Sequence, residues 1–437
     1  MKTTYLLLLS LTLPLTLRTA LAGNDDNTVR QGRLLLSDVI RAVGENNPSV
    51  RAADARWQAT KARVPQAAAW EDLGLQGESV VGRFVDIPPN SFTDQSVMLE
   101  QSLPLAGKNL SRARAATAEA GAAFEDLRRT QLDVLSRARS AYYRLANEYA
   151  QLEVNRRNVG LLNQFAELSR TRYEVGNATE ADVLTAKTDA ARLVETESDI
   201  LRRISDAQSA LNVLMNRAAQ APLGEPATLT FAPVNYSLGQ LQRLAFTARP
   251  EVQKAQNRIE AEKARVQLAR RDRVPDPAVS VKADRYNDTG RAVSELDVGV
   301  SIGLPFLNPK KYSAGIREAQ QNLEAAQQEF QAATNEAQGL VRDQLKKVET
   351  AAHHYELYRD KILPLARQTV QSHRTTYETS STNFLELITA ERVLQDVESA
   401  YLNHLADYQI ALAELDAVVG IGDTPSQKDS RSRSYSK

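Results

Sequence analysis

The stretch LDVGVSIGLPF (residues 296–306) decides the fold class of this chain. It alternates apolar residues with small or polar ones, and the apolar members are Leu296, Val298, Val300 and Ile302. A period of two predicts a β-strand with one apolar face, and Pro305 ends it. A second apolar run, residues 279–283, precedes it across a turn at residues 287–290. The two segments are therefore expected to form an antiparallel hairpin.

A second hairpin is expected earlier in the chain. Its first strand lies within residues 73–85, residues 88–90 form the turn, and Val97 and Leu99 mark its second strand. The dipeptides at 103–104 and 304–305 are both Leu-Pro, at an offset of 201, and other matching segments start at 47 and 249 and at 173 and 377. The offsets of the three pairs, 201, 202 and 204, are nearly constant, which indicates an internal duplication. The first repeat is expected over residues 23–220 and the second over residues 221–420.

Long helical segments surround each hairpin. They are expected at residues 36–70 and 108–175 in the first repeat, and at 237–273 and 313–379 in the second. The long helix of each repeat ends in a turn, at 176–179 or 380–383, and a returning helix of roughly 40 residues follows. The segment 108–175 alone would be roughly 100 Å long. The two shorter helices of a repeat, placed end to end, match that length, which predicts an elongated cylinder.

The returning helices show the spacing of coiled coils. In the second repeat the apolar stripe consists of Leu394, Val397, Tyr401, Leu405, Tyr408, Leu412 and Leu415. An ordinary bundle core would show the same stripe, and the length of the helices favours the cylinder instead. Pro364 and Gly160 occupy equivalent positions in the two long helices, and both residue types weaken a helix. A kink or bulge is therefore expected at both places.

The composition bounds the compartment and the chemistry. Lys2, an apolar run over residues 5–17 and the small residues before Gly23 predict a signal peptide, 1–22, cleaved after Ala22. The absence of cysteine excludes disulfides and thiolate ligands. The 54 basic and 54 acidic residues balance, so no nucleic-acid partner is indicated. The tail, residues 421–437, has few apolar residues to bury and is expected to be disordered.

Four strands per chain are too few for a membrane barrel, which needs about eight. An open sheet in lipid would leave backbone groups on its edges unpaired. If these hairpins enter a membrane, several chains must therefore pool their strands. The alternative is a soluble periplasmic coiled-coil scaffold that the hairpins decorate.

The doubled series of motifs resembles the outer membrane factor (TolC-like) family. The motifs that carry the resemblance are the Leu-Pro segments at 103–108 and 304–306, the Arg-Tyr-Glu-Val-Gly segment at 172–176 followed by 182–184, and the equivalent segment 377–390. The resemblance covers residues 36–420. It implies a mainly α fold with a small β part, in which a long coiled-coil helical barrel continues a transmembrane β-barrel shared by three subunits, with four strands from each chain and 12 per trimer.

The same resemblance implies a place and a set of partners. The chain would lie in the outer membrane of a Gram-negative bacterium, in contact with outer-membrane lipid, and extend into the periplasm as a homotrimer. It would be a passive efflux conduit that docks to a periplasmic adaptor (membrane fusion) protein and an inner-membrane pump of the RND type. Its short Leu103–Lys108 motif is similar to ducts of heavy-metal-cation exporters, and drugs or type I secreted proteins are alternative cargoes.

Membership also implies a periplasmic gate where the helices converge. Asp182 and Glu386 would supply carboxylates that threefold symmetry turns into rings, which favour cations; the alternative is that each acid only stabilises its own helix N-terminus. Tyr173 and Tyr377 would contact the gate or pack between helices. The tip turns at Gly176, Asn177, Ser380 and Ser381 would meet the adaptor. The chain departs from the family at Thr389, where a second acid is common, and at Thr382, where a basic latch residue can occur.

An enzymatic role is not expected. The four histidines are His353, His354, His373 and His404, without the spacing of a metal site. His353 and His354 are adjacent and point to different faces of a helix. The sequence has neither a glycine-rich phosphate loop nor a nucleophile elbow, so no cofactor is expected and the driving energy must come from the pump.

Overall fold

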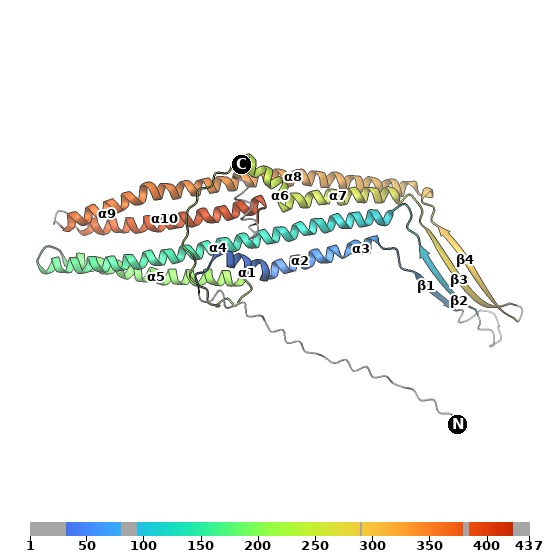
Figure 1. Cartoon of the computed structure of the whole chain (residues 1–437), viewed down its shortest axis with the longest axis horizontal. Coiled ribbons are helices and arrows are strands. Elements are labelled where there is room, and N and C mark those ends of the chain that lie inside the picture. Colours follow the sequence, from blue (N-terminus) through green and yellow to red (C-terminus); the bar gives the residue numbers. More distant parts are fainter. Residues whose placement is uncertain (1–31, 80–93, 289–290, 379–383, 423–437) are drawn as a thin grey trace, which may run out of the picture.

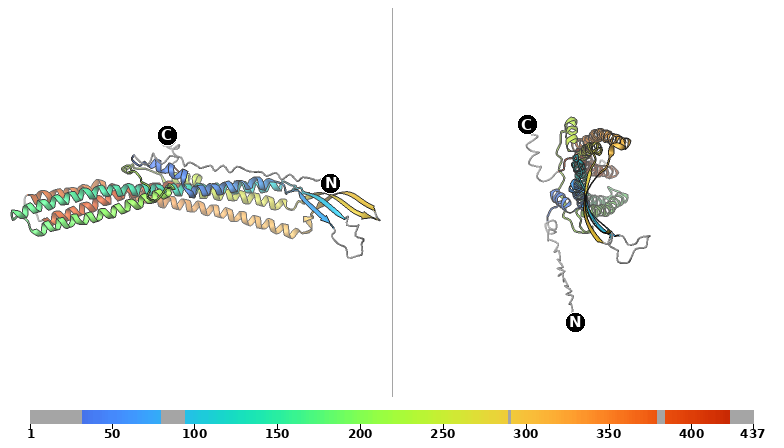
Figure 2. Two further views of the ribbon diagram at one scale, coloured as in Figure 1. Left: turned by 90° about the horizontal axis from the view of Figure 1, so that it is seen from below. Right: turned by 90° about the vertical axis from the view of Figure 1, so that its right-hand side faces the viewer.

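The computed structural model describes residues 32–79, 94–288, 291–378 and 384–422. The expected signal peptide and the part of the expected tail from residue 423 onward lie outside these ranges. The molecule is long and narrow: its strands gather at one end, and its helices run along the long axis to the opposite end (Figures 1 and 2). In the end-on view of Figure 2 the helices form a curved layer instead of a closed bundle.

The two halves of the chain contain the same order of elements. The first half consists of α1 (Leu36–Asn46), α2 (Pro48–Lys61), α3 (Arg63–Ala68), β1 (Gly74–Ser79), β2 (Gln95–Ser102), α4 (Lys108–Glu174) and α5 (Glu180–Leu214). The second consists of α6 (Leu238–Ala248), α7 (Pro250–Arg271), β3 (Pro277–Asp288), β4 (Arg291–Ile302), the 3-10 turn η3 (Pro305–Leu307), α8 (Pro309–Leu357), the π-helical segment η4 (Tyr358–Ile362), α9 (Leu363–Glu378) and α10 (Phe384–Val419). The predicted class, mainly α with a small β part, is confirmed.

The strands form one antiparallel sheet in the order β1-β2-β3-β4. Its register pairs Leu75 with Leu99, Leu99 with Val281, and Val281 with Val298. Residues directly opposite each other in a sheet point to the same face, so one apolar row crosses all the strands. Leu75 is 71% exposed and Val298 is 72% exposed. The apolar face of the sheet is therefore uncovered in the single chain.

The opposite face of the sheet is polar. Ser96, Asp284 and Glu295 form one row there, because β2 pairs Ser96 with Asp284 and β3 pairs Asp284 with Glu295. The next row includes Lys282, whose ammonium lies 2.9 Å from the Asp284 carboxylate. The alternation predicted from residues 296–302 thus gives the sheet one mainly apolar face and one mainly polar face, with Met98 and Val293 as apolar exceptions on the polar one.

The predictions of one continuous helix over residues 36–70 and another over residues 237–273 are wrong. The first is divided into α1, α2 and α3, and the second into α6 and α7. Asn47 and Arg249 have ψ angles of 124° at the two breaks, because a following proline disfavours the helical conformation. Asn47 then caps α2, since its side chain accepts hydrogen bonds from the N–H groups of Ser49 and Val50.

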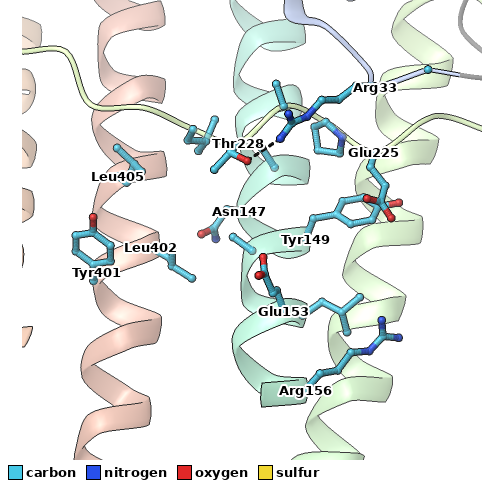
Figure 3. Close-up of a pocket in the computed structure, with 17 residues that line it drawn as sticks. Arg33, Asn147, Tyr149, Glu153, Arg156, Glu225, Thr228, Tyr401, Leu402 and Leu405 are labelled. Atoms are coloured by element: carbon cyan, nitrogen blue, oxygen red, sulfur yellow. Dashed lines mark hydrogen bonds between the residues drawn. The ribbon is translucent and has the colours of Figure 1, made fainter. Parts of the chain in front are cut away.

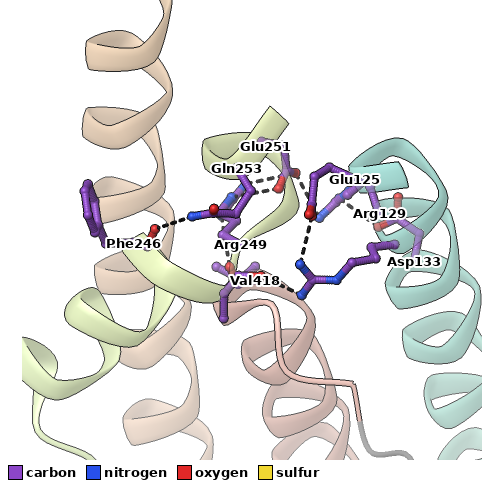
Figure 4. Close-up of polar contacts among 10 residues, drawn as sticks. Glu125, Arg129, Asp133, Phe246, Arg249, Glu251, Gln253 and Val418 are labelled. Carbon is purple, nitrogen blue, oxygen red and sulfur yellow. Dashed lines mark hydrogen bonds and ion pairs between the residues drawn. The ribbon is translucent and has the colours of Figure 1, made fainter. Parts of the chain in front are cut away.

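The break at Arg249 is held in place by charged side chains (Figure 4). Arg249 donates to the Glu251 carboxylate at 3.1 and 3.3 Å and to the carbonyl of Val418 at 3.1 Å. From α4, Arg129 lies 3.1 Å from Glu251. Gly420 follows α10 with φ +90°, and a Cβ there would approach the Ala248 carbonyl to 2.6 Å. The end of α10, the break and α4 are thereby tied together.

The long helical arms of the two halves differ. α4 is continuous from Lys108 to Glu174 and passes Gly160 without a π or 3-10 segment, so no bulge forms at Gly160. In the second half η4 separates α8 from α9 directly before Pro364, and the expected bulge is confirmed there. Proline removes a donor and clashes with the carbonyl four residues earlier, which a π turn relieves. Glycine costs only about 1 kcal/mol, which the packing of α4 offsets.

Three clusters of buried apolar side chains hold the arms together. The first joins α1 and α2 to α4 and α5, and the third joins α6 to α8 and α10. The second combines both halves near the tip, where Phe165 of α4 packs with Phe384 and Ile388 of α10. Near the middle of the molecule, Tyr142 accepts from the N–H of Ala227 at 3.0 Å and so anchors the segment between the halves.

Among the described residues, no helix is both long enough and apolar enough to cross a membrane.

Candidate functional site

The helical tip opposite the sheet brings the two halves together. Its first turn follows α4, where Gly176 has φ +78°, a conformation that favours glycine. The N–H of Asn177 donates to the carbonyl of Arg172 at 2.8 Å, which closes the helix end. The second turn, with Ser380, Ser381 and Thr382, lies outside the described residues. The docking role expected for Gly176 and Asn177, and for the two serines, stays a prediction.

The acids singled out from the sequence lie at the starts of the returning helices. Asp182 belongs to a capping box: its carboxylate accepts from the Thr179 N–H at 2.9 Å, and its own N–H donates to Thr179 Oγ1. Glu386 has a side chain that is 60% exposed, and its carboxylate lies 3.7 Å from Nδ1 of His373 on α9. Each acid therefore has a local partner within the chain.

The tyrosines singled out from the sequence differ in burial. Tyr173 is exposed, whereas Tyr377 is buried beneath α4. The guanidinium carbon of Arg172 lies 4.4 Å from the centre of the Tyr377 ring, and Arg172 also donates to the Tyr377 carbonyl. The Ser169 and Tyr377 hydroxyls are 3.3 Å apart. Tyr377 thus connects α9 to α4, while Tyr173 is not part of this contact.

A salt bridge that the sequence did not reveal joins α5 to α10. Arg392 donates from Nε to Asp189 Oδ2 at 3.0 Å and from Nη2 to Asp189 Oδ1 at 2.8 Å. The Asp189 side chain is only 7% exposed. Such a two-pronged contact between a guanidinium and a carboxylate is among the stronger polar contacts in proteins. The one available signal was that Asp189 follows Asp182 by two helical turns and shares its face.

Deeper along the same arm, two acids of α10 are buried. Glu398 accepts from Arg157 of α4 and, at 3.3 Å, from Arg367 of α9. Glu391 is 2% exposed. Burial, together with the negative charge of Glu398, raises the pKa of Glu391 to about 7. The α4–α5 coil and the α9–α10 coil are therefore joined by Arg172–Tyr377, Asp189–Arg392 and Arg157–Glu398, three contacts that we call the inter-coil clamps.

A separate open cavity of about 1000 Å³ lies near the middle of the molecule, where residues 225–229 cross α4 and α10 (Figure 3). Arg33 in its wall donates to Thr228 at 2.8 Å, and Arg156 donates to Glu197 at 2.7 Å. None of the described residues that line it is a histidine or cysteine. Across the described part of the chain, no group of three or more metal-ligating side chains is assembled.

A family model described as outer membrane efflux protein matches residues 39–217 and 241–421. A probable efflux pump outer membrane protein, SepC, and a toluene efflux pump outer membrane protein, TtgF, both of Pseudomonas putida, are each 25% identical over 259 residues, 59% of this chain. The chain spans about half the length of these two relatives, 51%.

A third relative matches over almost its whole length. The cobalt-zinc-cadmium resistance protein CzcC of Cupriavidus metallidurans is 21% identical over 392 residues, which are 89% of this chain and 90% of that protein. Among solved structures, CusC has a TM-score of 0.76 at 17% identity, over 89% of this chain and 92% of that one. The outer membrane protein VceC of Vibrio cholerae has a TM-score of 0.72 at 21% identity, over 89% and 96%. These structures share the fold.

Proposed function

The chain belongs to the outer membrane efflux protein family, and we propose that it is the channel subunit of a tripartite efflux system. In this role it forms a passive conduit from the periplasm to the exterior. The observation that carries the proposal is the sheet, whose apolar face is uncovered in the single chain and lies at one end of a long helical body. A soluble coiled-coil scaffold would leave that face in water, where exposed apolar patches of this kind are rare.

The open edges of the sheet support a trimer. β1 and β4 are the outer strands, and neither outer edge pairs with another described strand. In lipid those edges must be paired, because unpaired backbone groups are costly there. Pairing β4 of one subunit with β1 of the next closes the sheet, and three chains supply 12 strands, above the minimum of about eight. The apolar rows then face lipid and the rows of Asp284 and Glu295 face the lumen.

The tip is the proposed gate. The inter-coil clamps connect α9–α10 to α4–α5, so opening the lumen by moving one coil requires breaking them. Glu386 and Asp182 are proposed to add carboxylate rings at the entrance, a secondary role beside their local contacts with His373 and Thr179. Gly176 and Asn177 present the first tip turn to a periplasmic adaptor, which couples the conduit to an inner-membrane pump of the RND type.

Heavy-metal cations are the proposed cargo. The cobalt-zinc-cadmium resistance relative matches over 90% of its length, whereas the toluene pump relative matches over 51%. Organic solvents or drugs are the second candidate, because the toluene pump relative is the more identical of the two over the matched part, at 25% against 21%. A carboxylate-lined constriction favours cations, which agrees with the first candidate.

The decisive experiment is expression followed by fractionation and planar-bilayer recording. We expect heat-modifiable trimers in the outer-membrane fraction and discrete cation-selective conductance steps. A soluble monomer, or trimers without conductance, would overturn the channel. For the cargo, a deletion strain should become more sensitive to Co²⁺, Zn²⁺ or Cd²⁺ than to toluene. The reverse order of sensitivity would assign the organic cargo instead.

A further inference from the structure

Three of the four histidines of the chain gather at one place, where α8 meets α10. The ring centres of His354 and His404 are 5.3 Å apart. The ring of His353, the preceding residue on α8, lies 6.3 Å from that of His354. The adjacent pair at 353–354 cannot chelate a metal by itself, but His404 supplies an imidazole from a different helix. Helix packing has therefore assembled a pair that the spacing in sequence does not show.

The separation of the two rings matches that of two imidazoles on one metal ion. A first-row cation such as Zn²⁺ lies 2.0–2.1 Å from an imidazole nitrogen, and therefore about 3.2 Å from the ring centre. At a tetrahedral angle, two such rings have centres about 5.2 Å apart. The observed 5.3 Å agrees with this value. The planes are inclined by 60°, so the rings are not stacked on each other.

Tyrosines around the pair fix the packing of the two helices and of the His404 ring. Tyr355 follows His354 on α8, and Tyr401 lies one turn before His404 on α10; their rings stack at 5.2 Å and their hydroxyls are 3.0 Å apart. This contact fixes the register of α8 against α10. Tyr358 meets the His404 ring edge-on at 4.7 Å, and it is the first residue of η4. π-Helical segments of this kind occur frequently at functional sites.

The charges near the pair suit a cation. The negative charge of Asp407 acts on His404 from the same helix and also attracts a bound cation.

We propose that His354 and His404 form a two-imidazole binding site for a divalent transition-metal cation such as Zn²⁺, Ni²⁺, Co²⁺ or Cu²⁺. Imidazole suits these ions, whereas Mg²⁺ and Ca²⁺ prefer oxygen ligands. Since the described part of the chain offers no group of three ligating side chains, water completes the coordination. Such a site binds more weakly than a closed structural site and exchanges its ion readily. The proposal of this two-histidine site does not depend on which cargo the conduit carries.

The test uses the purified full-length trimer with any affinity tag removed. Zn²⁺ binding is measured by isothermal titration calorimetry, and the ligand set by Cu²⁺ electron paramagnetic resonance, in which coupled nitrogens are resolved. The variants are His354→Gln, His404→Gln and the double variant. The matched controls are His353→Gln, the residue before His354 on α8, and His373→Gln, near the tip. Every variant is first checked for its trimeric state.

We expect one Zn²⁺ per chain and a nitrogen signature in the wild type. Each single variant of the pair should lose at least about tenfold in affinity, as losing one of two ligands requires, and both controls should stay within about twofold. Because His354 is exposed, its variant should assemble even if the His404 variant does not. Wild-type Zn²⁺ binding by the His354→Gln trimer, or an equal loss in the controls, would overturn the proposal.

Discussion

Removing the guanidinium of Arg392 should shift the proposed gate toward its open state. Arg392→Ala deletes the charge-assisted hydrogen bonds to Asp189 and leaves that carboxylate, 7% exposed, without its main partner. Among the described residues, the other cation within ion-pair distance of Asp189 is Arg192, at 3.7 Å. The Asp189–Arg392 clamp is thus the dominant polar contact between α5 and α10 in this part of the helical arm.

The magnitude follows from the burial of the two partners. Breaking a buried ion pair costs about 3–5 kcal/mol, but the Arg392 side chain is 47% exposed, so solvent replaces part of the interaction. We therefore expect a loss of about 2 kcal/mol per chain. If the contact exists only in the closed state, the ratio of open to closed conformations rises roughly 30-fold for each subunit, and the effect on a channel whose three subunits open together is larger.

Single-channel recording in planar bilayers measures this ratio as the open probability. A matched control is Arg202→Ala on α5, which removes an exposed pair with Asp206 and should change nothing. Asp189→Ala should resemble Arg392→Ala, and the double variant should lose less than the sum of the two. An intact Arg392→Ala trimer with wild-type open probability, or an equal effect in the Arg202 control, would refute the role of the clamp.

Three further predictions concern stability and assembly. The pKa of Glu391 is raised to about 7, so the stability contributed by its protonated form is complete below the ordinary pKa of 4.5 and is lost as pH rises through 7. Glu391→Gln should therefore have the same melting temperature as the wild type near pH 4.5 and a higher one at pH 8. Equal melting temperatures of the two proteins at both pH values would contradict this. Val298→Lys places a charge on the apolar face of the sheet at a cost of up to about 2–4 kcal/mol in lipid, so heat-resistant trimers should disappear from the outer-membrane fraction. Asp297→Lys, on the polar face, should leave the trimers in place. Equal trimer yields from the two variants would argue against a lipid-facing surface. Gly420→Ala should destabilise the chain by more than about 1 kcal/mol, because its φ is +90° and its Cβ would lie 2.6 Å from the Ala248 carbonyl; an unchanged urea midpoint would show that the turn adapts.

The sequence predicted the elements whose signals are local. The alternation over residues 296–302 identified β4 and its apolar side, because side chains in a strand alternate between two faces. The constant offset between the halves gave the same order of helices and strands in each. Pro364 identified η4. The breaks at Asn47 and Arg249 were missed, although Pro48 and Pro250 were visible, because proline is also well tolerated at the first turn of a helix.

The contacts between helices could not be predicted. Asp189 meets Arg392 across 203 residues, and His354 meets His404 across two different helices. Which faces of two helices meet depends on how their side chains interdigitate along the whole interface, and one sequence does not specify that. The acids chosen from the family pattern, Asp182 and Glu386, were identifiable because they stand beside turns.

The open edges of β1 and β4 have a genetic consequence. In the proposed trimer every subunit completes its neighbour's sheet, so a subunit that cannot pair spoils the whole ring. When equal amounts of a normal and an edge-defective chain are made in one cell, only roughly one eighth of randomly assembled threefold rings contain normal chains alone. Mutations in these strands should therefore be dominant, whereas loss of the gene should be recessive.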